Sequence, residues 1–89
     1  MRYTVVWKPI AETELAEIYL ATDDRAAISE AADRIDALLS HDPLRYGKPR
    51  FDDIYVMRVS PLGVEFRVAE LDRRVTIIAI WETGSPSVD

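Results

Sequence analysis

Hydrophobic and polar residues alternate with two different periods along the chain, and the change of period separates helical from extended segments. Residues 2–8, RYTVVWK, are rich in β-branched and aromatic residues, with Tyr3, Val5 and Trp7 on one face. This pattern predicts a strand. Pro9 ends the strand and suits the first turn of a helix, and the apolar residues that follow have helical spacing. The chain therefore opens with a strand and an amphipathic helix.

A second helix is predicted for residues 24–40, because its apolar residues follow the i, i+3, i+4, i+7 rule. The side chains that share this face, and that we expect in the core, are Ile28, Ala31, Ala32, Ile35, Leu38 and Leu39. Asp23 and Asp24 are suitable caps for its first turn, and Pro43 stops it shortly after His41. Since the link between the helices is short, we expect an antiparallel helical hairpin.

The second half of the chain is predicted to be extended. Residues 42–53, DPLRYGKPRFDD, mix proline, glycine and charges without a period, which indicates a connecting loop. Strands are expected at 54–60, 64–71 and 74–82, with turns at SPLG and LDRR. The fold class is thus α+β in two layers: an N-terminal strand, an antiparallel two-helix hairpin and a three-stranded antiparallel meander. We expect a four-stranded sheet with the helices on one face.

Alternation within the meander places Arg58 and Arg67 on the face of the sheet that the helices leave uncovered. A guanidinium is always charged, so these side chains either bind a phosphate or protein target or pair with carboxylates. Glu65 and Glu70 lie on the same hairpin, and cross-strand ion pairs are common. The ion-paired interpretation is favoured, and the target-binding one stays open.

Length and composition predict a single soluble domain over residues 1–89, with a flexible tail at 83–89. Hydrophobic residues make up 48% of the chain, yet no apolar run reaches the roughly 20 residues that cross a bilayer. The N-terminus lacks the apolar core of a signal peptide, and cysteine is absent. We therefore expect a cytoplasmic protein without disulfides, thiolate nucleophiles or contact with a membrane.

Charge and the types of polar residue exclude several kinds of site. Residues 1–42 contain four basic and nine acidic side chains, which accounts for the net charge of −5, whereas residues 43–89 balance at seven and seven. Only the second half is able to carry a basic patch for a nucleic acid. His41, the one histidine, is expected to complement a helix dipole, and Asp52 and Asp53 are expected in a turn. Neither a metal nor a cofactor is predicted.

Three segments, taken in order, resemble the RelE/ParE superfamily of bacterial type II toxins, also labelled plasmid stabilisation proteins. The first is the opening YTVVWKPIAETELAEI, and the third is MRVSPLGVEFRV. Between them comes the series Ile35, Leu38, Leu39, Pro43 and Gly47. The resemblance covers nearly the whole chain, and it implies the two-layer fold of that superfamily.

The resemblance also implies a function. Such a toxin binds a cognate antitoxin and, when free, attacks translation or DNA gyrase. RelE-like members cleave mRNA in the ribosomal A site, and ParE-like members poison gyrase. Arg58 and Arg67 match basic positions of the family's strands, and Lys48 and Arg50 fall where the preceding loop adds charge. These four are the implied target- or antitoxin-binding residues, with Arg58 and Arg67 as the candidates for catalysis.

The chain departs from the nuclease members at its end. Many of them close the last strand with a basic pair and continue to a tyrosine, whereas this chain reads IIAIWETGSPSVD. Glu82 and Thr83 stand in place of the basic pair. We therefore prefer ParE-like gyrase inhibition or target binding. A ribosome-dependent mRNA endonuclease is the alternative, and an interaction domain without toxicity is the third.

Overall fold

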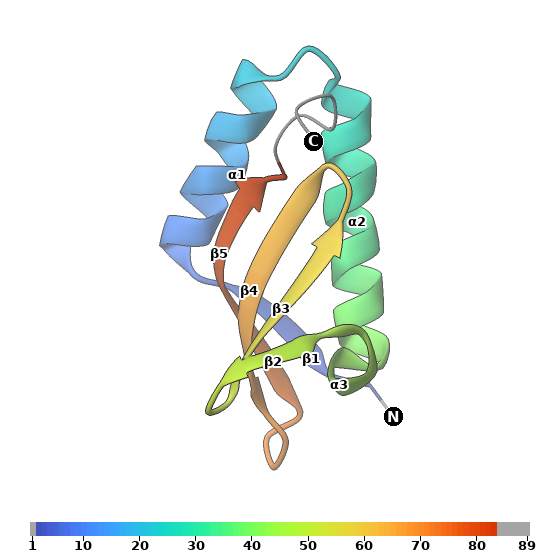
Figure 1. Ribbon diagram of the computed structural model, residues 1–89, viewed down its shortest axis with the longest axis vertical. Coiled ribbons are helices and arrows are strands. Elements are labelled where there is room, and N and C mark those ends of the chain that lie inside the picture. The colour runs from blue at the N-terminus through green and yellow to red at the C-terminus, as the bar shows by residue number, and fades with distance from the viewer. Residues whose placement is uncertain (1, 84–89) are drawn as a thin grey trace.

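Two long helices pack against one face of a twisted sheet (Figure 1), in a computed structural model that describes residues 2–83. In chain order the elements are β1 (Thr4–Trp7), α1 (Pro9–Ala21), α2 (Arg25–His41), α3 (Pro43–Tyr46), β2 (Lys48–Phe51), β3 (Ile54–Val59), β4 (Leu62–Ala69) and β5 (Arg74–Glu82). The two-layer α+β architecture predicted from the sequence is confirmed.

The strands form one sheet in the order β1-β5-β4-β3-β2. β1 runs parallel to β5, and every other neighbouring pair is antiparallel. The meander of three strands is confirmed, and residues 54–81 contain no helix. The sheet has five strands in the described part of the chain, so the expectation of four was wrong.

The fifth strand comes from residues 42–53, which the sequence predicted to be a loop. This segment instead forms the single turn α3 and the edge strand β2, joined at Gly47. Every residue of β2 is exposed, so its sequence has no alternation of apolar and polar residues to reveal a strand. Pro49 is tolerated there because an edge strand has one side without a ladder.

Both long helices begin as their sequences predicted. Pro9 occupies the first turn of α1, and the Asp24 carboxylate accepts a hydrogen bond of 3.1 Å from the Ala27 amide at the start of α2. Three residues link the helices, which run antiparallel in Figure 1. The predicted helical hairpin is therefore confirmed.

The core lies between the hairpin and the inner face of the sheet. Its buried side chains are Ala11, Ile28, Ala31, Ile35, Leu39, Met57, Leu62, Val64, Phe66, Val68, Val75, Ile77 and Ile80. Ile35 is fully buried, as expected. Ala32 and Leu38 are only half-buried at the margin of this cluster, which corrects the prediction that they are core residues.

The last strands end close to where the sequence placed them. β4 begins at Leu62, two residues earlier than predicted, so Ser60 and Pro61 alone connect it to β3. The Thr83 amide donates to the Pro61 carbonyl at 2.8 Å. Within residues 2–83, no helix is long and apolar enough to cross a membrane. Residues 84–89 of the predicted flexible tail lie outside the described residues.

Candidate functional site

The face of the sheet opposite the helices, here called the open face, carries the predicted site residues. The strand register aligns Lys48 with Val56, Arg58 with Gly63, and Arg67 with Ile54. Paired residues share a face, and so do residues two apart, which places these three cations on the same side of the sheet. Arg50 joins them, since its Nε lies 3.5 Å from a carboxylate oxygen of Glu65.

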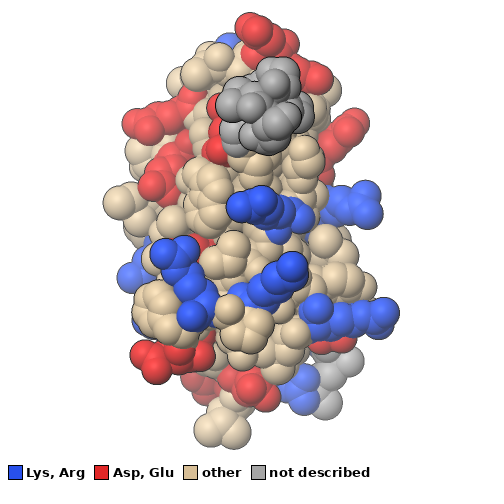
Figure 2. Space-filling view, in the orientation of Figure 1, with Lys and Arg blue, Asp and Glu red and all other residues tan. Residues whose placement is uncertain are grey.

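Basic side chains gather on this face although the chain as a whole is acidic. Figure 2 shows Lys and Arg over the middle of the molecule, with Asp and Glu above them, toward the end where the helices are linked, and again at the lower end. The acidic excess of the sequence lies in residues 1–42, which form β1 and the helical hairpin, behind the open face. The open face is therefore the cationic side of an acidic protein.

Among residues 2–83, an ion pair is formed by Arg67 and none by Arg58. Arg67 Nε lies 3.2 Å from a carboxylate oxygen of Asp53, in the turn before β3. Glu65 pairs with Arg50, so Glu65 and Glu70 are not the partners of Arg67 that the sequence suggested. Within residues 2–83, no carboxylate oxygen lies within 4.0 Å of a side-chain nitrogen of Arg58. Arg58 therefore keeps its donors available.

Two clefts meet at Arg58. The first, here called the sheet cleft, lies on the open face and is lined by Tyr46, Lys48, Pro49, Arg50, Val56, Met57 and Arg58. The second, here called the edge cleft, lies between α2 and β3 and is lined by Ala27, Glu30, Ala31, Arg34, Leu38, Tyr46, Arg58, Val59 and Ser60. The structure thus brings Lys48, Arg50 and Arg58 together and leaves Arg67 outside both clefts.

Sequence reasoning missed Tyr46, which contributes to both clefts, and Arg34, which lines the second. The alternation of basic and aromatic residues in RYGKPRF, residues 45–51, was the available signal. The Arg45 guanidinium lies 5.8 Å from the ring centre of Tyr46, and a similar pair joins Arg50 to Phe51 at 6.0 Å. Each pair holds a guanidinium within about 6 Å of an aromatic ring, the range of a cation–π contact.

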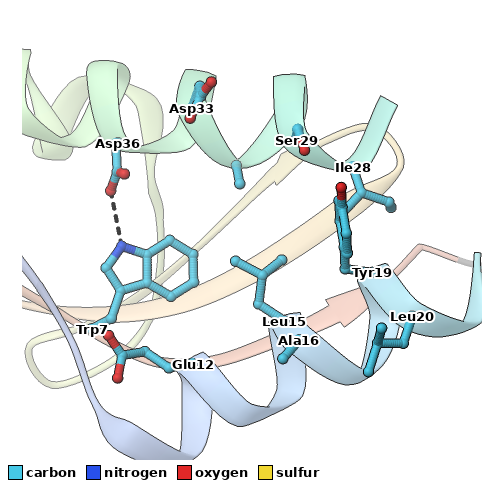
Figure 3. A pocket seen from close by; sticks show the side chains of 11 residues that line it. Trp7, Glu12, Leu15, Ala16, Tyr19, Leu20, Ile28, Ser29, Asp33 and Asp36 are labelled. Atoms are coloured by element: carbon cyan, nitrogen blue, oxygen red, sulfur yellow. Dashed lines mark hydrogen bonds between the residues drawn. The ribbon is translucent and has the colours of Figure 1, made fainter. Parts of the chain in front are cut away.

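A third surface, here called the helix groove, runs between α1 and α2 with a volume of about 590 Å³ (Figure 3). Its lining residues are Trp7, Glu12, Leu15, Ala16, Tyr19, Leu20, Ile28, Ser29, Ala32, Asp33 and Asp36. At one end, Trp7 Nε1 donates a hydrogen bond of 2.9 Å to Asp36 Oδ1. Three carboxylates and no basic side chain line this groove, so its apolar floor has an acidic rim.

The open face is equipped to bind anions rather than to transfer protons. His41 is exposed at the end of α2 and lines neither cleft nor the helix groove. Among residues 2–83, no three His, Cys, Asp or Glu side chains come together in a way that would hold a metal ion. The clefts thus offer chiefly guanidinium and ammonium donors, which stabilise negative charge, together with the phenol of Tyr46, the hydroxyl of Ser60 and one carboxylate, that of Glu30.

Several solved structures with the same fold come from toxin–antitoxin systems. A chain of the RelBE2 toxin–antitoxin complex from Mycobacterium tuberculosis has a TM-score of 0.77 at 21% identity, over 92% of this chain and 99% of that one. A chain of the chromosomal ParDE system of P. aeruginosa has a TM-score of 0.72 at 16% identity, over 93% and 98%. The isolated E. coli RelE toxin has a TM-score of 0.68 at 17% identity, over 97% and 89%.

By sequence, the chain matches no protein-family model and no curated protein. The structural likeness nevertheless confirms that the chain has the fold of the RelE and ParE proteins, as the resemblance in sequence implied. Both branches are represented at similar TM-scores, so the fold does not separate RelE-like from ParE-like chemistry.

Proposed function

We propose that the protein is the toxin of a bacterial type II toxin–antitoxin system, neutralised by a cognate antitoxin. The observation that carries this proposal is the cationic open face, where Lys48, Arg50 and Arg58 surround one cleft in a chain with a net charge of −5. A surface of opposite sign to the rest of the protein is a binding surface for an anionic target. The shared fold supports this class of protein, because structures with that fold come from RelBE and ParDE systems.

The helix groove supports the second half of the proposal, the antitoxin. Its apolar floor is exposed in part, and Leu20 is 69% exposed. Glu12, Asp33 and Asp36 lie along its rim. An amphipathic helix with basic flanks fits such a groove, because its apolar face covers the floor while its cations meet the carboxylates. We assign this groove to a basic helical segment of the antitoxin.

For the target, we prefer binding without cleavage, as in ParE-like inhibition of gyrase. Self-cleavage of RNA by its 2′-hydroxyl requires a base for that hydroxyl and an acid for the leaving oxygen. Arginine keeps its proton, and the one histidine lies away from both clefts. The terminal basic pair of many nuclease members is also replaced by Glu82 and Thr83.

One observation favours the alternative, a ribosome-dependent mRNA endonuclease. The sheet cleft concentrates three cations beside Tyr46, and such a cluster stabilises the extra charge of a phosphate under attack. Primer extension on translated mRNA distinguishes this alternative from our preference. Growth after induction distinguishes a toxin from a non-toxic interaction domain.

The antitoxin assignment is tested by co-expression with the product of the neighbouring small gene. We expect the two proteins to purify as a complex whose dissociation constant rises with salt, because exposed charges are screened. Asp33→Lys should weaken the complex by about 1 kcal/mol or more, since it places a cation opposite basic side chains. The matched control is Asp72→Lys, in the exposed turn between β4 and β5, which should change nothing. Proteins that separate freely at low salt would refute the assignment.

A further inference from the structure

The two faces of β5 are exchanged partway along the strand. Before the exchange, Val75 and Ile77 are fully buried, so the odd-numbered residues face the core. After it, the buried residue is Ile80, and Trp81 is only half-buried. Because side chains alternate along a strand, an unbroken β5 would direct Trp81 into the core. The indole lies on the open face instead.

A β-bulge causes this exchange. Phe66 of β4 pairs with Ile77. The residue before it, Glu65, pairs with Ala79, so Ile78 is an extra residue with no partner of its own in β4. One inserted residue reverses the inward and outward positions in the rest of a strand. Bulges are frequent beside functional sites, where they redirect a side chain, and the side chain redirected here is the indole.

The redirected indole lies over Gly63, in the row of the open face that also holds Arg58. Gly63 pairs with Arg58 on one side and with Trp81 on the other. A Cβ at Gly63 would come within 2.6 Å of the indole Nε1, so the glycine leaves the space that the ring occupies. Since neighbouring strands are about 4.8 Å apart, the ring extends from β5 across β4 toward β3. The indole and the Arg58 side chain are therefore neighbours on the open face.

Both side chains keep groups that are able to bind a ligand. Arg58 is exposed, and no carboxylate oxygen in residues 2–83 lies within 4.0 Å of its side-chain nitrogens. Trp81 Nε1 makes no hydrogen bond to a side chain or carbonyl of the same described residues. Trp7 Nε1 differs, because it donates to Asp36 at 2.9 Å. The row thus offers guanidinium donors, an indole donor and part of an aromatic ring.

The surroundings of Trp81 favour one class of target. Trp81 also borders a cleft between α1 and β5, whose lining contains the carboxylates of Glu14, Glu17 and Glu82. A nucleic acid strand carries a negative charge on every nucleotide, so a strand that passed from Arg58 over the indole would next approach these carboxylates. A protein segment avoids this repulsion, because it is able to present an acidic side chain to Arg58 and an apolar one to the indole. The charges around the row therefore favour a protein.

The types of residue agree with a protein target. Trp, Tyr and Arg are the residues that most often dominate the binding energy of protein interfaces. Arg58 has Trp81 on one side, across Gly63, and shares the sheet cleft with Tyr46. A tryptophan in such a position buries a large apolar area and retains a donor for a polar group of the partner.

We infer that Trp81 is the specificity-determining residue of the open face: an apolar side chain of a protein target packs on the indole, while a neighbouring acidic group of that target binds Arg58. The inference deepens the proposed function and rests on it in assigning the open face to the target of the toxin. The helix groove lies on the opposite side of the sheet, so Trp81 contributes to binding of the target and not of the antitoxin.

The first test needs no knowledge of the target. The probe is a nine-residue peptide of alternating aspartate and leucine, and the comparisons are an asparagine–leucine peptide, an aspartate–serine peptide and a uridine oligonucleotide. NMR of the full chain resolves the indole N–H signals of its two tryptophans, which Trp7→Phe assigns. We expect the aspartate–leucine peptide to shift the Trp81 signal, and each comparison peptide to bind about fivefold more weakly or less.

Variants of the full chain locate the binding energy in this row. Trp81→Ala should weaken binding of the aspartate–leucine peptide about tenfold or more, measured from backbone amide shifts, because it truncates an interface tryptophan. Arg58→Ala should weaken it about fivefold, the effect of losing an exposed ion pair. The matched control is Leu71→Ala, which removes a fully exposed apolar side chain in the turn between β4 and β5 and should have no effect.

Three results of these titrations would overturn the inference. Equal binding of the asparagine–leucine peptide would exclude a role for charge at Arg58. An unshifted Trp81 signal at millimolar aspartate–leucine peptide would exclude the indole as a binding surface. Oligonucleotide binding that shifts the Trp81 signal, and that is tighter than binding of the aspartate–leucine peptide, would assign the row to nucleic acid.

The second test separates this inference from the proposed function. Growth is followed after induction of the wild-type chain, Trp81→Ala or Trp81→Phe, at matched protein levels and with the fold checked by circular dichroism. We expect the wild type to stop growth and Trp81→Ala to lose the arrest. Trp81→Phe should keep most of it, because phenylalanine retains an aromatic ring. Each chain is also purified with the product of the neighbouring small gene, which Trp81→Ala should bind as tightly as the wild type does.

The outcomes of this test distinguish the two claims. Arrest by Trp81→Ala as strong as that by the wild type overturns the inference and leaves the toxin assignment intact. Relief that is accompanied by loss of the antitoxin complex also overturns it, because Trp81 then supports the fold rather than selects a target. Normal growth with the wild-type chain contradicts the proposed function, and the peptide titrations then decide the inference by themselves.

Discussion

The carboxylate of Glu14 on α1 accepts a hydrogen bond of 3.0 Å from the backbone amide of Ile80 on β5. β1 pairs with β5 only as far as Ile77, and α1 begins at Pro9, two residues after β1 ends. Glu14 thus takes the place of a neighbouring strand for the next part of β5. A helix side chain completes the hydrogen bonding of the sheet, so the position of α1 is fixed by this bond as well as by its apolar face.

This relationship predicts a measurable loss of stability. Glu14→Ala leaves the partly buried Ile80 amide without its partner, which should lower the free energy of unfolding by about 1–3 kcal/mol. Glu14→Gln keeps an acceptor oxygen and should lose less. Glu17→Ala, on the same helix but exposed, is the control. Chemical denaturation measures all three, and equal stability of the Glu14→Ala and Glu17→Ala variants would show that the bond contributes nothing.

A second stability prediction compares two neighbouring positions of α2. Ile35 is fully buried, so Ile35→Ala should cost about 2–5 kcal/mol, a large share of the stability of a small domain. Leu38 is half-buried beside the edge cleft, and Leu38→Ala should cost less than half as much. Urea unfolding monitored by circular dichroism tests the difference. A larger loss for Leu38→Ala would mean that α2 is rotated relative to the sheet.

A third prediction concerns Gly63, whose close contact with Trp81 shapes the open face. A Cβ added at Gly63 would lie 2.6 Å from the Trp81 indole, closer than any real contact of that kind. Gly63→Ala should therefore displace this ring and shift its fluorescence emission to longer wavelength as it becomes more exposed. Ala79→Gly, on the same face, is a control that removes a side chain without crowding the indole. Unchanged emission in Gly63→Ala would show that Trp81 does not rest on residue 63.

The long, periodic elements could be predicted from the sequence, whereas the arrangement of the site could not. α2 repeats its apolar pattern from Ile28 to Leu39, and β4 alternates strictly from Val64 to Val68, so each carries its own signal. Segment 43–51 does not, because α3 is one turn long and β2 is exposed on both faces. Its assignment to the sheet depends on pairing with β3, which is a tertiary contact.

The same limit applies to the candidate residues. Their placement on the open face follows from alternation, and the structure agrees for Arg58 and Arg67. The partner of Arg67 does not follow from it, because Asp53 reaches that guanidinium only through the turn between β2 and β3. Arg34 lies far away in the sequence, on a helix whose outer face gives no sign of which strand it borders.

The difference between the two arginines leads to a functional prediction. If induction of the protein arrests growth, Arg58→Ala should relieve the arrest more than Arg67→Ala, because Arg67 is occupied by Asp53 whereas Arg58 is available. Both side chains are exposed, so both variants should fold normally by circular dichroism. Colony counts after induction, at matched protein levels, give the comparison. Relief of the arrest by Arg67→Ala alone would show that the target-binding site lies outside the two clefts.

The preference for binding over cleavage is tested by primer extension on translated mRNA. Loss of one preorganised donor costs an enzyme about 10²–10³ in rate, and here both the terminal basic pair and a positioned acid–base pair are lacking in the residues described. We expect no codon-dependent cleavage after induction, even if growth stops. New cleavages within minutes of induction that disappear in Arg58→Ala would restore the ribosome-dependent endonuclease.

The assignment as a toxin is tested most directly by the growth of bacteria that express the chain alone or together with the product of the neighbouring small gene. We expect induction of the chain alone to stop growth, and co-expression to restore it. Normal growth in both cultures, with the chain shown to be folded and present at the same level, would contradict a toxin and leave an interaction domain without toxicity.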